Sequence, residues 1–89
     1  PQVPLHFIIN KNYFTIGRRK DNDGVVDISK QISRFHCSVK LINGKFGIID
    51  ENSLYGTELN HKKCVPGRFY ELQDGDIIQL PAISFKVQR

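Results

Sequence analysis

The chain has 89 residues, which is enough for one small globular domain with a modest core. Its 13 basic and 9 acidic side chains leave a formal net charge of +4, which suits an anionic partner. That charge does not choose among a phosphopeptide, a nucleic acid and a membrane surface. No apolar run approaches the ~20 residues that a membrane span needs, and no segment has the pattern of a signal peptide.

Short β-rich runs, separated by Gly, Pro, Asn and Asp, follow one another along the whole chain. No window of about a dozen residues has a helical period. We therefore predict an all-β fold, an antiparallel sandwich or barrel with ten to eleven short strands. The predicted strands are residues 5–10, 13–16, 25–28, 36–42, 45–50, 57–59, 62–64, 69–72, 76–80 and 83–87.

Two local patterns support this prediction. In residues 36–42 the apolar Cys37, Val39 and Leu41 alternate with polar residues, as in a strand with one buried face. Asn43-Gly44 follows, and it is a strong signal for a two-residue hairpin because both central residues of a type I′ turn have positive φ.

Cys37 and Cys64 do not have the spacing of a metal site. A small secreted domain stabilised by disulfides would be expected to contain more cysteines. We therefore expect two reduced thiols packed as small hydrophobes, and an intracellular protein. Because the chain begins without Met, we expect residues 1–89 to be a single domain cut from a longer protein.

Three polar stretches lie where predicted strands meet loops: Gly17-Arg18, residues 33–36 (Ser-Arg-Phe-His) and residues 52–57 (Asn-Ser-Leu-Tyr-Gly-Thr). Together they offer two guanidinium groups and several hydroxyls. Arginine suits a phosphate because its planar fork donates two parallel hydrogen bonds. If these loops met at one end of a sandwich, they would surround a single anion.

The order of these stretches resembles the forkhead-associated (FHA) domain family. Gly-Arg, then Ser-Arg-x-His, then Ser-x-x-Gly-Thr and an Asn at position 60 follow that family's pattern, and the likeness extends from about residue 5 to residue 87. The resemblance implies an FHA/SMAD-like sandwich of two twisted antiparallel sheets. It also implies that the three polar loops lie at one end and bind phosphothreonine peptides.

The resemblance assigns ligand contacts to specific residues. Arg18 matches the arginine that grips the phosphate, Ser33 the hydroxyl that donates to a phosphate oxygen, and Arg34 a position that contacts the phosphate or the peptide backbone. The usual Thr-Asn before Gly-Thr is replaced here by Leu54 and Tyr55, which we expect, with the loop after Arg18, to contact the peptide residues that follow the phosphothreonine. Leu54 cannot donate a side-chain hydrogen bond, and the loss of such a donor would weaken binding by roughly 1–3 kcal/mol.

Other matched residues are expected to support the loops. Gly17 permits a close approach of the backbone, and Gly56 adopts a conformation that other residues resist. Side chains of Ser53 and Thr57 are expected to bond to the backbone. His36 lies near Ser33, but no Asp is available to orient it as a catalytic base, so we expect a structural histidine. The supporting set is Gly17, His36, Ser53, Gly56, Thr57 and Asn60.

The basic residues outside these motifs have two interpretations. Arg19, Lys20 and Lys30 could be plain solvated charges. They could instead contact anionic groups near the phosphothreonine, either acidic residues or a second phosphate. Lys62 and Lys63 are expected on a hairpin distant from the site, as solubilising charges.

These residues predict a phosphopeptide-binding module that mediates phosphorylation-dependent protein–protein interaction. We expect no enzyme activity, cofactor, metal or small-molecule substrate, and no membrane partner. One alternative is a scaffold of the same fold that binds a protein partner without phosphate, because Leu54 and Tyr55 depart from the family. A second alternative, suggested by the net charge of +4, is a basic nucleic-acid module. Against it, the sequence shows no evident exposed aromatics on which bases could stack. The resemblance favours the nucleus over the cytoplasm.

Overall fold

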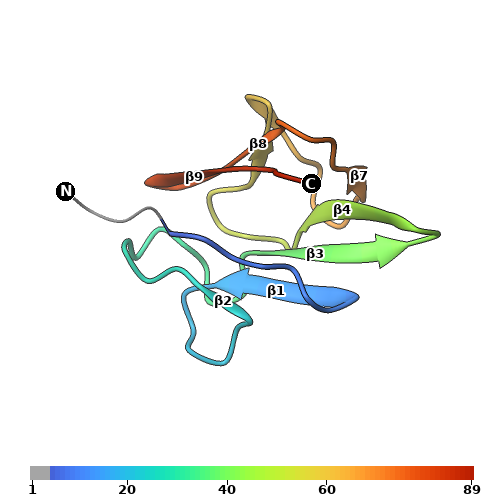
Figure 1. The fold of residues 1–89 in the computed structure, drawn as a ribbon. Coiled ribbons are helices and arrows are strands. Elements are labelled where there is room, and N and C mark those ends of the chain that lie inside the picture. Colours follow the sequence, from blue (N-terminus) through green and yellow to red (C-terminus); the bar gives the residue numbers. More distant parts are fainter. Residues whose placement is uncertain (1–4) are drawn as a thin grey trace.

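The computed structural model describes residues 5–89, which form two packed β-sheets (Figure 1). The five-stranded sheet has the order β2-β1-β3-β4-β7, and the four-stranded sheet has the order β6-β5-β8-β9. The strands of the first sheet are β1 (Tyr13–Gly17), β2 (Gly24–Val25), β3 (Cys37–Ile42), β4 (Lys45–Asp50) and β7 (Tyr70–Glu71). Those of the second are β5 (Glu58–Leu59), β6 (Lys62–Lys63), β8 (Ile77–Leu80) and β9 (Ile83–Lys86).

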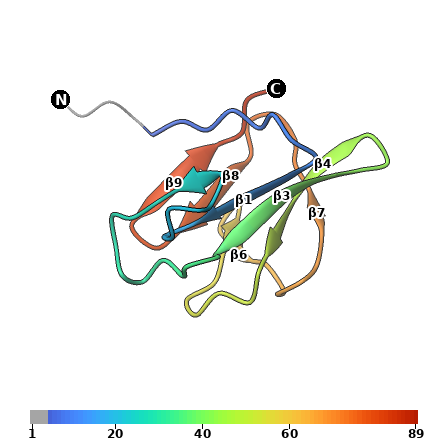
Figure 2. The ribbon, with the colours of Figure 1, turned by 90° about the horizontal axis from the view of Figure 1, so that it is seen from below.

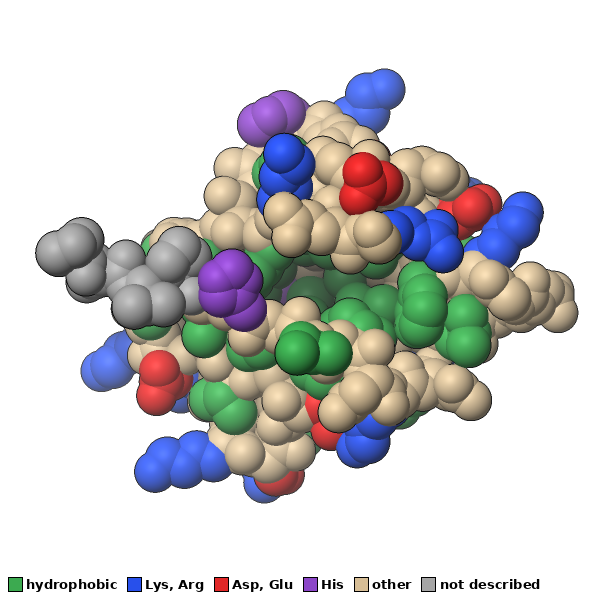
Figure 3. Space-filling view, in the orientation of Figure 1, with side chains coloured by type: hydrophobic (Ala, Val, Ile, Leu, Met, Phe, Trp, Pro, Cys, Tyr) green, Lys and Arg blue, Asp and Glu red, His purple; other side chains and the backbone are tan. Residues whose placement is uncertain are grey.

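The core lies between the two sheets, as the β-sandwich prediction requires. Phe14 and Ile16 of β1, Val39 of β3 and Ile48 of β4 are buried there, and Ile78 of β8 faces them from the other sheet. Hydrophobic side chains gather across the middle of the face in Figure 3, whereas Lys and Arg side chains lie around its edge. Both cysteines are buried, free thiols, as predicted.

The strand predicted at residues 5–10 is wrong, because the structure assigns no strand there. Phe7 packs on Phe14 and Phe85, with ring centroids 6.0 and 5.3 Å apart, while Ile8 is 82% exposed. The alternation of apolar residues therefore reports which side chains face the core. It does not by itself provide a neighbouring strand with which the backbone can pair.

The strand predicted at residues 25–28 is shorter than expected, and its pairing differs. β2 ends at Val25 and runs parallel to β1, so one pair of this otherwise antiparallel sheet is parallel. Val26 N donates to Gly17 O at 2.8 Å. Gly17 is the last residue of β1, so the strand provides no further partner, and Ile28 is left 57% exposed.

The predicted hairpins are present. Asn43 and Gly44 have φ values of 52° and 76°, as a type I′ turn between β3 and β4 requires. Asn60 and His61, with φ values of 51° and 67°, join β5 to β6 in the same way. Within residues 5–89, the structure contains no helix with the length and apolar character of a membrane span.

The sheet order places the three polar stretches at one end of the sandwich. β1 and β4 end where β3 begins, because both pair antiparallel with β3. The segments 18–23, 26–36 and 51–57 therefore leave the sheets at the same end, which both views show (Figures 1 and 2).

Candidate functional site

The segment after β1 and the segment before β3 are joined through their backbones. Arg18 N donates to Ser33 O at 3.0 Å, and Arg19 N donates to Arg34 O at 3.3 Å. These bonds continue the pairing of β1 and β3 beyond the strand ends. The two predicted phosphate-binding motifs, Gly17-Arg18 and Ser33-Arg34, are therefore side by side.

Gly17 is required for this close approach. A Cβ atom built there would collide with the carbonyl oxygen of Arg34 and lie 2.9 Å from Asn22 Nδ2. The buried Asn22 amide donates to the carbonyl oxygens of Arg19 and Arg34, at 2.9 and 2.7 Å. Asn22 thus clamps the first loop onto the second, a role that the sequence pattern did not reveal.

The Arg18 side chain is positioned by the neighbouring loop. Its Nε donates to the carbonyl oxygen of Ile32 at 2.9 Å, and the residue is half-buried. Ile32 is itself completely buried, so the acceptor is part of a fixed backbone. The Nη atoms, rather than Nε, are therefore the donors that Arg18 can direct at an anion.

Ser33 connects the second loop to the third. Its backbone N donates to His36 Nδ1 at 3.0 Å, and its hydroxyl oxygen accepts a hydrogen bond from Leu54 N at 3.0 Å. Because the hydroxyl acts as an acceptor toward Leu54, its own hydrogen can be donated elsewhere. Ser33 can therefore donate to a ligand oxygen while it fixes the 51–57 loop.

His36 is completely buried and makes two hydrogen bonds through opposite ring nitrogens. Nδ1 accepts from Ser33 N, so the ring proton lies on Nε2, which donates to Gly56 O at 2.8 Å. Burial lowers the pKa of His36 from its ordinary value of 6.5, although the Gly56 carbonyl and Asp50 oppose this effect. A neutral imidazole with both nitrogens occupied supports the structural role expected from the sequence, rather than that of a base.

The completely buried carboxylate of Asp50 organises the third loop, and sequence reasoning missed it. It accepts hydrogen bonds from Ser53 N at 3.1 Å, Ser53 Oγ at 2.6 Å and Thr57 Oγ1 at 2.7 Å. Gly56 N donates in turn to Ser53 Oγ at 2.9 Å, and Gly56 has a φ of 90°. Ser53 makes the expected bond to the backbone, since its hydroxyl accepts from Gly56 N, whereas Thr57 bonds to the Asp50 carboxylate instead. An Asp at a strand end, three residues before a Ser, was the available signal.

The surface around these anchored groups is partly apolar. Leu54 is 80% exposed and Tyr55 is 54% exposed, so the two residues that depart from the family pattern face solvent. Phe35 is also exposed, and the Arg19 guanidinium carbon lies 5.3 Å from its ring centroid. Arg34 is exposed and presents its side chain at the same end.

Two assignments differ from the rest in where the structure places them. Asn60 lies outside the three loops: its side chain donates to Asp76 Oδ1 at 3.0 Å and accepts from Ile77 N at 2.9 Å, which ties the β5–β6 turn to β8. The expectation that Lys63 lies far from the site is wrong. A Cβ built on Gly56 would lie 2.5 Å from Lys63 Cε, so this side chain crosses the third loop.

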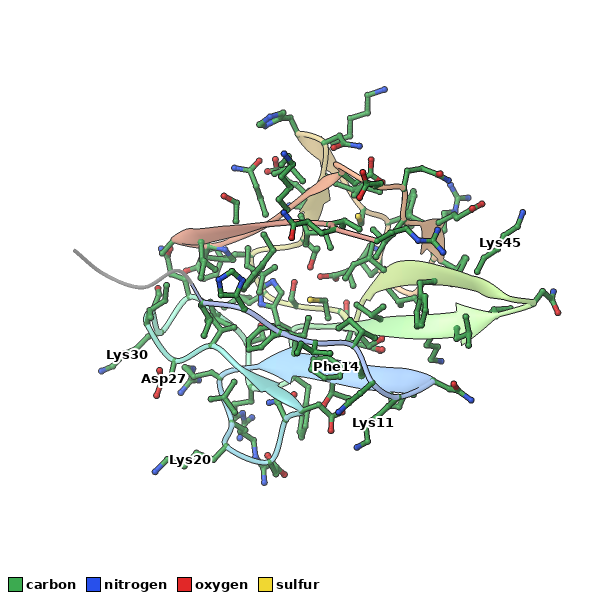
Figure 4. The ribbon with its side chains drawn as sticks, viewed as in Figure 1. Lys11, Phe14, Lys20, Asp27, Lys30 and Lys45 are labelled. Atoms are coloured by element: carbon green, nitrogen blue, oxygen red, sulfur yellow. The ribbon has the colours of Figure 1, made fainter. Side chains whose placement is uncertain are left out.

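Other charged groups at this end point outward. Lys20 and Lys30 extend away from the body of the domain in Figure 4, whereas Lys45 lies at the opposite end of β4. Across residues 5–89, no group of three or more His, Cys, Asp or Glu side chains is arranged to hold a metal ion. The arrangement is therefore a set of hydrogen-bonded polar groups surrounded by outward-pointing cations and exposed apolar side chains.

Comparison with known proteins matches this arrangement. The family model described as "FHA domain" matches residues 14–81, which include all three loops. The human E3 ubiquitin-protein ligase CHFR is 34% identical over 77 residues, which cover 84% of this chain but 11% of the ligase. This chain therefore corresponds to a small part of that relative.

Solved structures agree on the fold. Mycobacterium tuberculosis EmbR in complex with a low-affinity phosphopeptide is similar with a TM-score of 0.83 and 30% identity, covering 90% of this chain and 20% of EmbR. The N-terminal FHA domain of S. cerevisiae Rad53p, in complex with a phosphothreonine peptide, has a TM-score of 0.72 and 28% identity. That match covers 76% of this chain and 55% of the other.

Proposed function

Because this chain belongs to the FHA domain family, we propose that it is a phosphopeptide-binding module that recognises phosphothreonine through its 18–23, 26–36 and 51–57 loops. The observation that carries the proposal is that Ser33 forms hydrogen bonds within its own loop and to the third loop. This residue contacts His36 in its own loop and Leu54 in the third, while its backbone carbonyl accepts from Arg18 N. These hydrogen bonds hold together the segments that carry Arg18, Ser33 and Leu54, which supports the proposal that their donors share one ligand.

The chemistry of phosphothreonine fits these donors. At neutral pH the phosphate carries about −1.5 to −2 charges and three acceptor oxygens. Arg18 supplies a fork of parallel N–H donors, Ser33 supplies a hydroxyl, and Arg34 adds a second guanidinium at the same end. Recognition by Arg and hydroxyl groups on a rigid β-scaffold is a known mode of phosphopeptide binding.

The experiment that tests this function compares one peptide in three forms: with phosphothreonine, with phosphoserine and with unmodified threonine. We expect fluorescence anisotropy to show binding of the phosphothreonine form and none of the unmodified form. By resemblance to the family, the γ-methyl group packs in a small pocket, so phosphoserine should bind more weakly. Equal binding of the two phosphopeptides would contradict the pocket, and equal binding of all three would contradict the function.

Exposed Leu54 and Tyr55 favour one other function, which is binding of a folded partner without phosphate. These residues replace the Thr-Asn pair that the family uses at the peptide. Binding to a partner that survives both dephosphorylation and the Arg18→Ala substitution would support this alternative. The two functions therefore differ in one measurable property, which is whether binding of the partner requires phosphate.

The proposed module has no catalytic activity of its own. CHFR is a ubiquitin-protein ligase, but the matched residues make up 11% of it. The proposal includes an intracellular location, where a phosphothreonine on a protein partner is available. Because similar structures come from a bacterium and a yeast, the comparisons do not favour the nucleus over the cytoplasm.

A further inference from the structure

Lys63 lies against the loop that is expected to carry the peptide. A Cβ built on Gly56 would be 2.5 Å from Lys63 Cε and 3.3 Å from its Nζ, so the aliphatic stem and the ammonium group cross the backbone at Gly56. Lys63 belongs to β6 in the four-stranded sheet. Lys63 therefore reaches the third loop from the four-stranded sheet, whereas Arg18 and Arg34 lie on loops that adjoin the five-stranded sheet.

The backbone beneath Lys63 is fixed from three directions. Gly56 N donates to Ser53 Oγ, and Gly56 O accepts from His36 Nε2. Two residues earlier, Leu54 N donates to the Ser33 hydroxyl, which is one of the proposed phosphate donors. A peptide whose phosphate meets Ser33 and whose chain crosses residues 54–56 would therefore pass the Lys63 ammonium.

Lys63 has no acidic partner within the described chain. The ion pairs among residues 5–89 involve Lys11, Arg19 and Lys45, and none includes Lys63. Glu58 is its register partner on β5, but their charged groups do not form an ion pair. The cation is positioned by packing over Gly56, and it forms no ion pair with a described residue.

We propose that Lys63 is a specificity-determining residue that contacts a second anionic side chain of the phosphopeptide, a carboxylate or a second phosphate. This inference rests on the proposed function, and it names which phosphopeptides the same site prefers. An exposed ion pair of this kind contributes a small, salt-dependent preference. We expect a twofold to fivefold effect on affinity, about the range that such pairs give.

The test uses a panel of phosphothreonine peptides in which each flanking position in turn is Ala, Glu, Lys or phosphoserine. Affinities are measured for the wild-type chain, Lys63→Met and Lys62→Met. Methionine retains the apolar stem and removes the charge, and Lys62 is the neighbouring β6 residue, so the two variants have the same net charge. A Lys63→Glu variant supplies the reversed charge.

We expect one flanking position at which the wild type prefers Glu over Ala about twofold to fivefold. Lys63→Met should abolish that preference, Lys62→Met should retain it, and Lys63→Glu should favour Lys at the same position. The phosphoserine peptides show whether a second phosphate is preferred to a carboxylate. A flat profile in the wild type, or equal losses in both Met variants, would overturn the inference and leave the proposed function intact. Equal binding of phosphorylated and unphosphorylated peptides would instead overturn the proposed function.

Discussion

Thr57 donates its hydroxyl hydrogen to the carboxylate of Asp50 at 2.7 Å, and both side chains are completely buried. The same carboxylate accepts two hydrogen bonds from Ser53. Asp50 ends β4 and Thr57 immediately precedes β5, so these bonds close the 51–57 loop and connect the two sheets. The position of Leu54, and with it Ser33, follows from that closure.

Replacing Asp50 with Asn should destabilise the domain and weaken phosphopeptide binding. The NH2 group of the amide replaces one carboxylate oxygen, so it faces either the Ser53 N–H, which now donates to Oδ2, or the two hydroxyls, which now donate to Oδ1. Either orientation sets donor against donor. Leaving such buried groups unsatisfied costs roughly 1–3 kcal/mol. Chemical denaturation should show a lower free energy of unfolding than for Thr57→Val, which removes only one of the three bonds. An Asp50→Asn variant as stable as the wild type would contradict this account of the loop.

Asn22→Asp should separate the first two loops. The carboxylate would face the carbonyl oxygens of Arg19 and Arg34, to which the amide now donates, and acceptors would repel one another. We expect the free energy of unfolding to fall by about 1–3 kcal/mol. Asn10→Asp makes the same change of charge at an exposed position and serves as the control. Similar losses in both variants would mean that Asn22 is not the clamp.

The lowered pKa of His36 leads us to expect that the domain loses stability in mild acid. Burial lowers its pKa below 6.5, so the unfolded chain binds this proton more readily than the folded chain. The stabilisation is therefore complete above pH 6.5 and declines as the pH falls through the folded pKa. The pKa values of Asp23 and Asp76 are lowered by hydrogen bonds from Lys11 and Asn60, so their contributions are lost only in stronger acid, below about pH 3.8.

Thermal unfolding between about pH 7.5 and pH 5 measures this dependence, because the window lies around the ordinary histidine pKa. The wild type should lose stability toward the acid end, while His36→Gln should be less stable at neutral pH and vary less with pH. His61→Gln makes the same change at an exposed histidine and serves as the matched control. An unchanged pH profile in His36→Gln would refute the assignment.

Tyr55→Asn should tighten binding. The family uses an Asn at this position to hold the peptide backbone, and Tyr55 is 54% exposed at the matching place. An added amide hydrogen bond is worth about 1 kcal/mol, or roughly a fivefold gain in affinity. Tyr55→Ala removes the ring without adding the amide, so it separates the two effects. If Tyr55→Asn bound no better than Tyr55→Ala, the peptide would cross this loop in a different register.

The sequence predicted the parts of the fold that depend on local pattern. The Asn43-Gly44 turn and the alternating β3 follow from the conformations that those residues favour. Pairing of distant segments is not encoded in such patterns, and this is why residues 5–10 were expected to be a strand and the parallel β1–β2 pair was not expected. An apolar alternation indicates a buried face, whereas pairing depends on which edge is free.

The residues of the candidate site also fall into those that a local motif reveals and those that depend on contacts between distant segments. Arg18, Ser33 and His36 were found because each belongs to a short motif at a strand end. Asp50, Asn22 and Lys63 were missed because their importance lies in contacts with residues 3 to 12 positions away. Asp50 resembles any polar residue at the end of a strand until the buried hydroxyls around it are seen.

The most direct test of the central claim compares Arg18→Ala with Lys45→Ala in a titration with one phosphothreonine peptide. Both substitutions remove one positive charge, but Lys45 lies at the opposite end of β4 from the 51–57 loop (Figure 4). If the three loops form the phosphate site, Arg18→Ala should abolish phosphate-dependent binding and Lys45→Ala should leave the affinity within about twofold of the wild type. Equal affinities of the two variants would contradict the site, because binding would then depend on net charge rather than on the guanidinium positioned by Ile32.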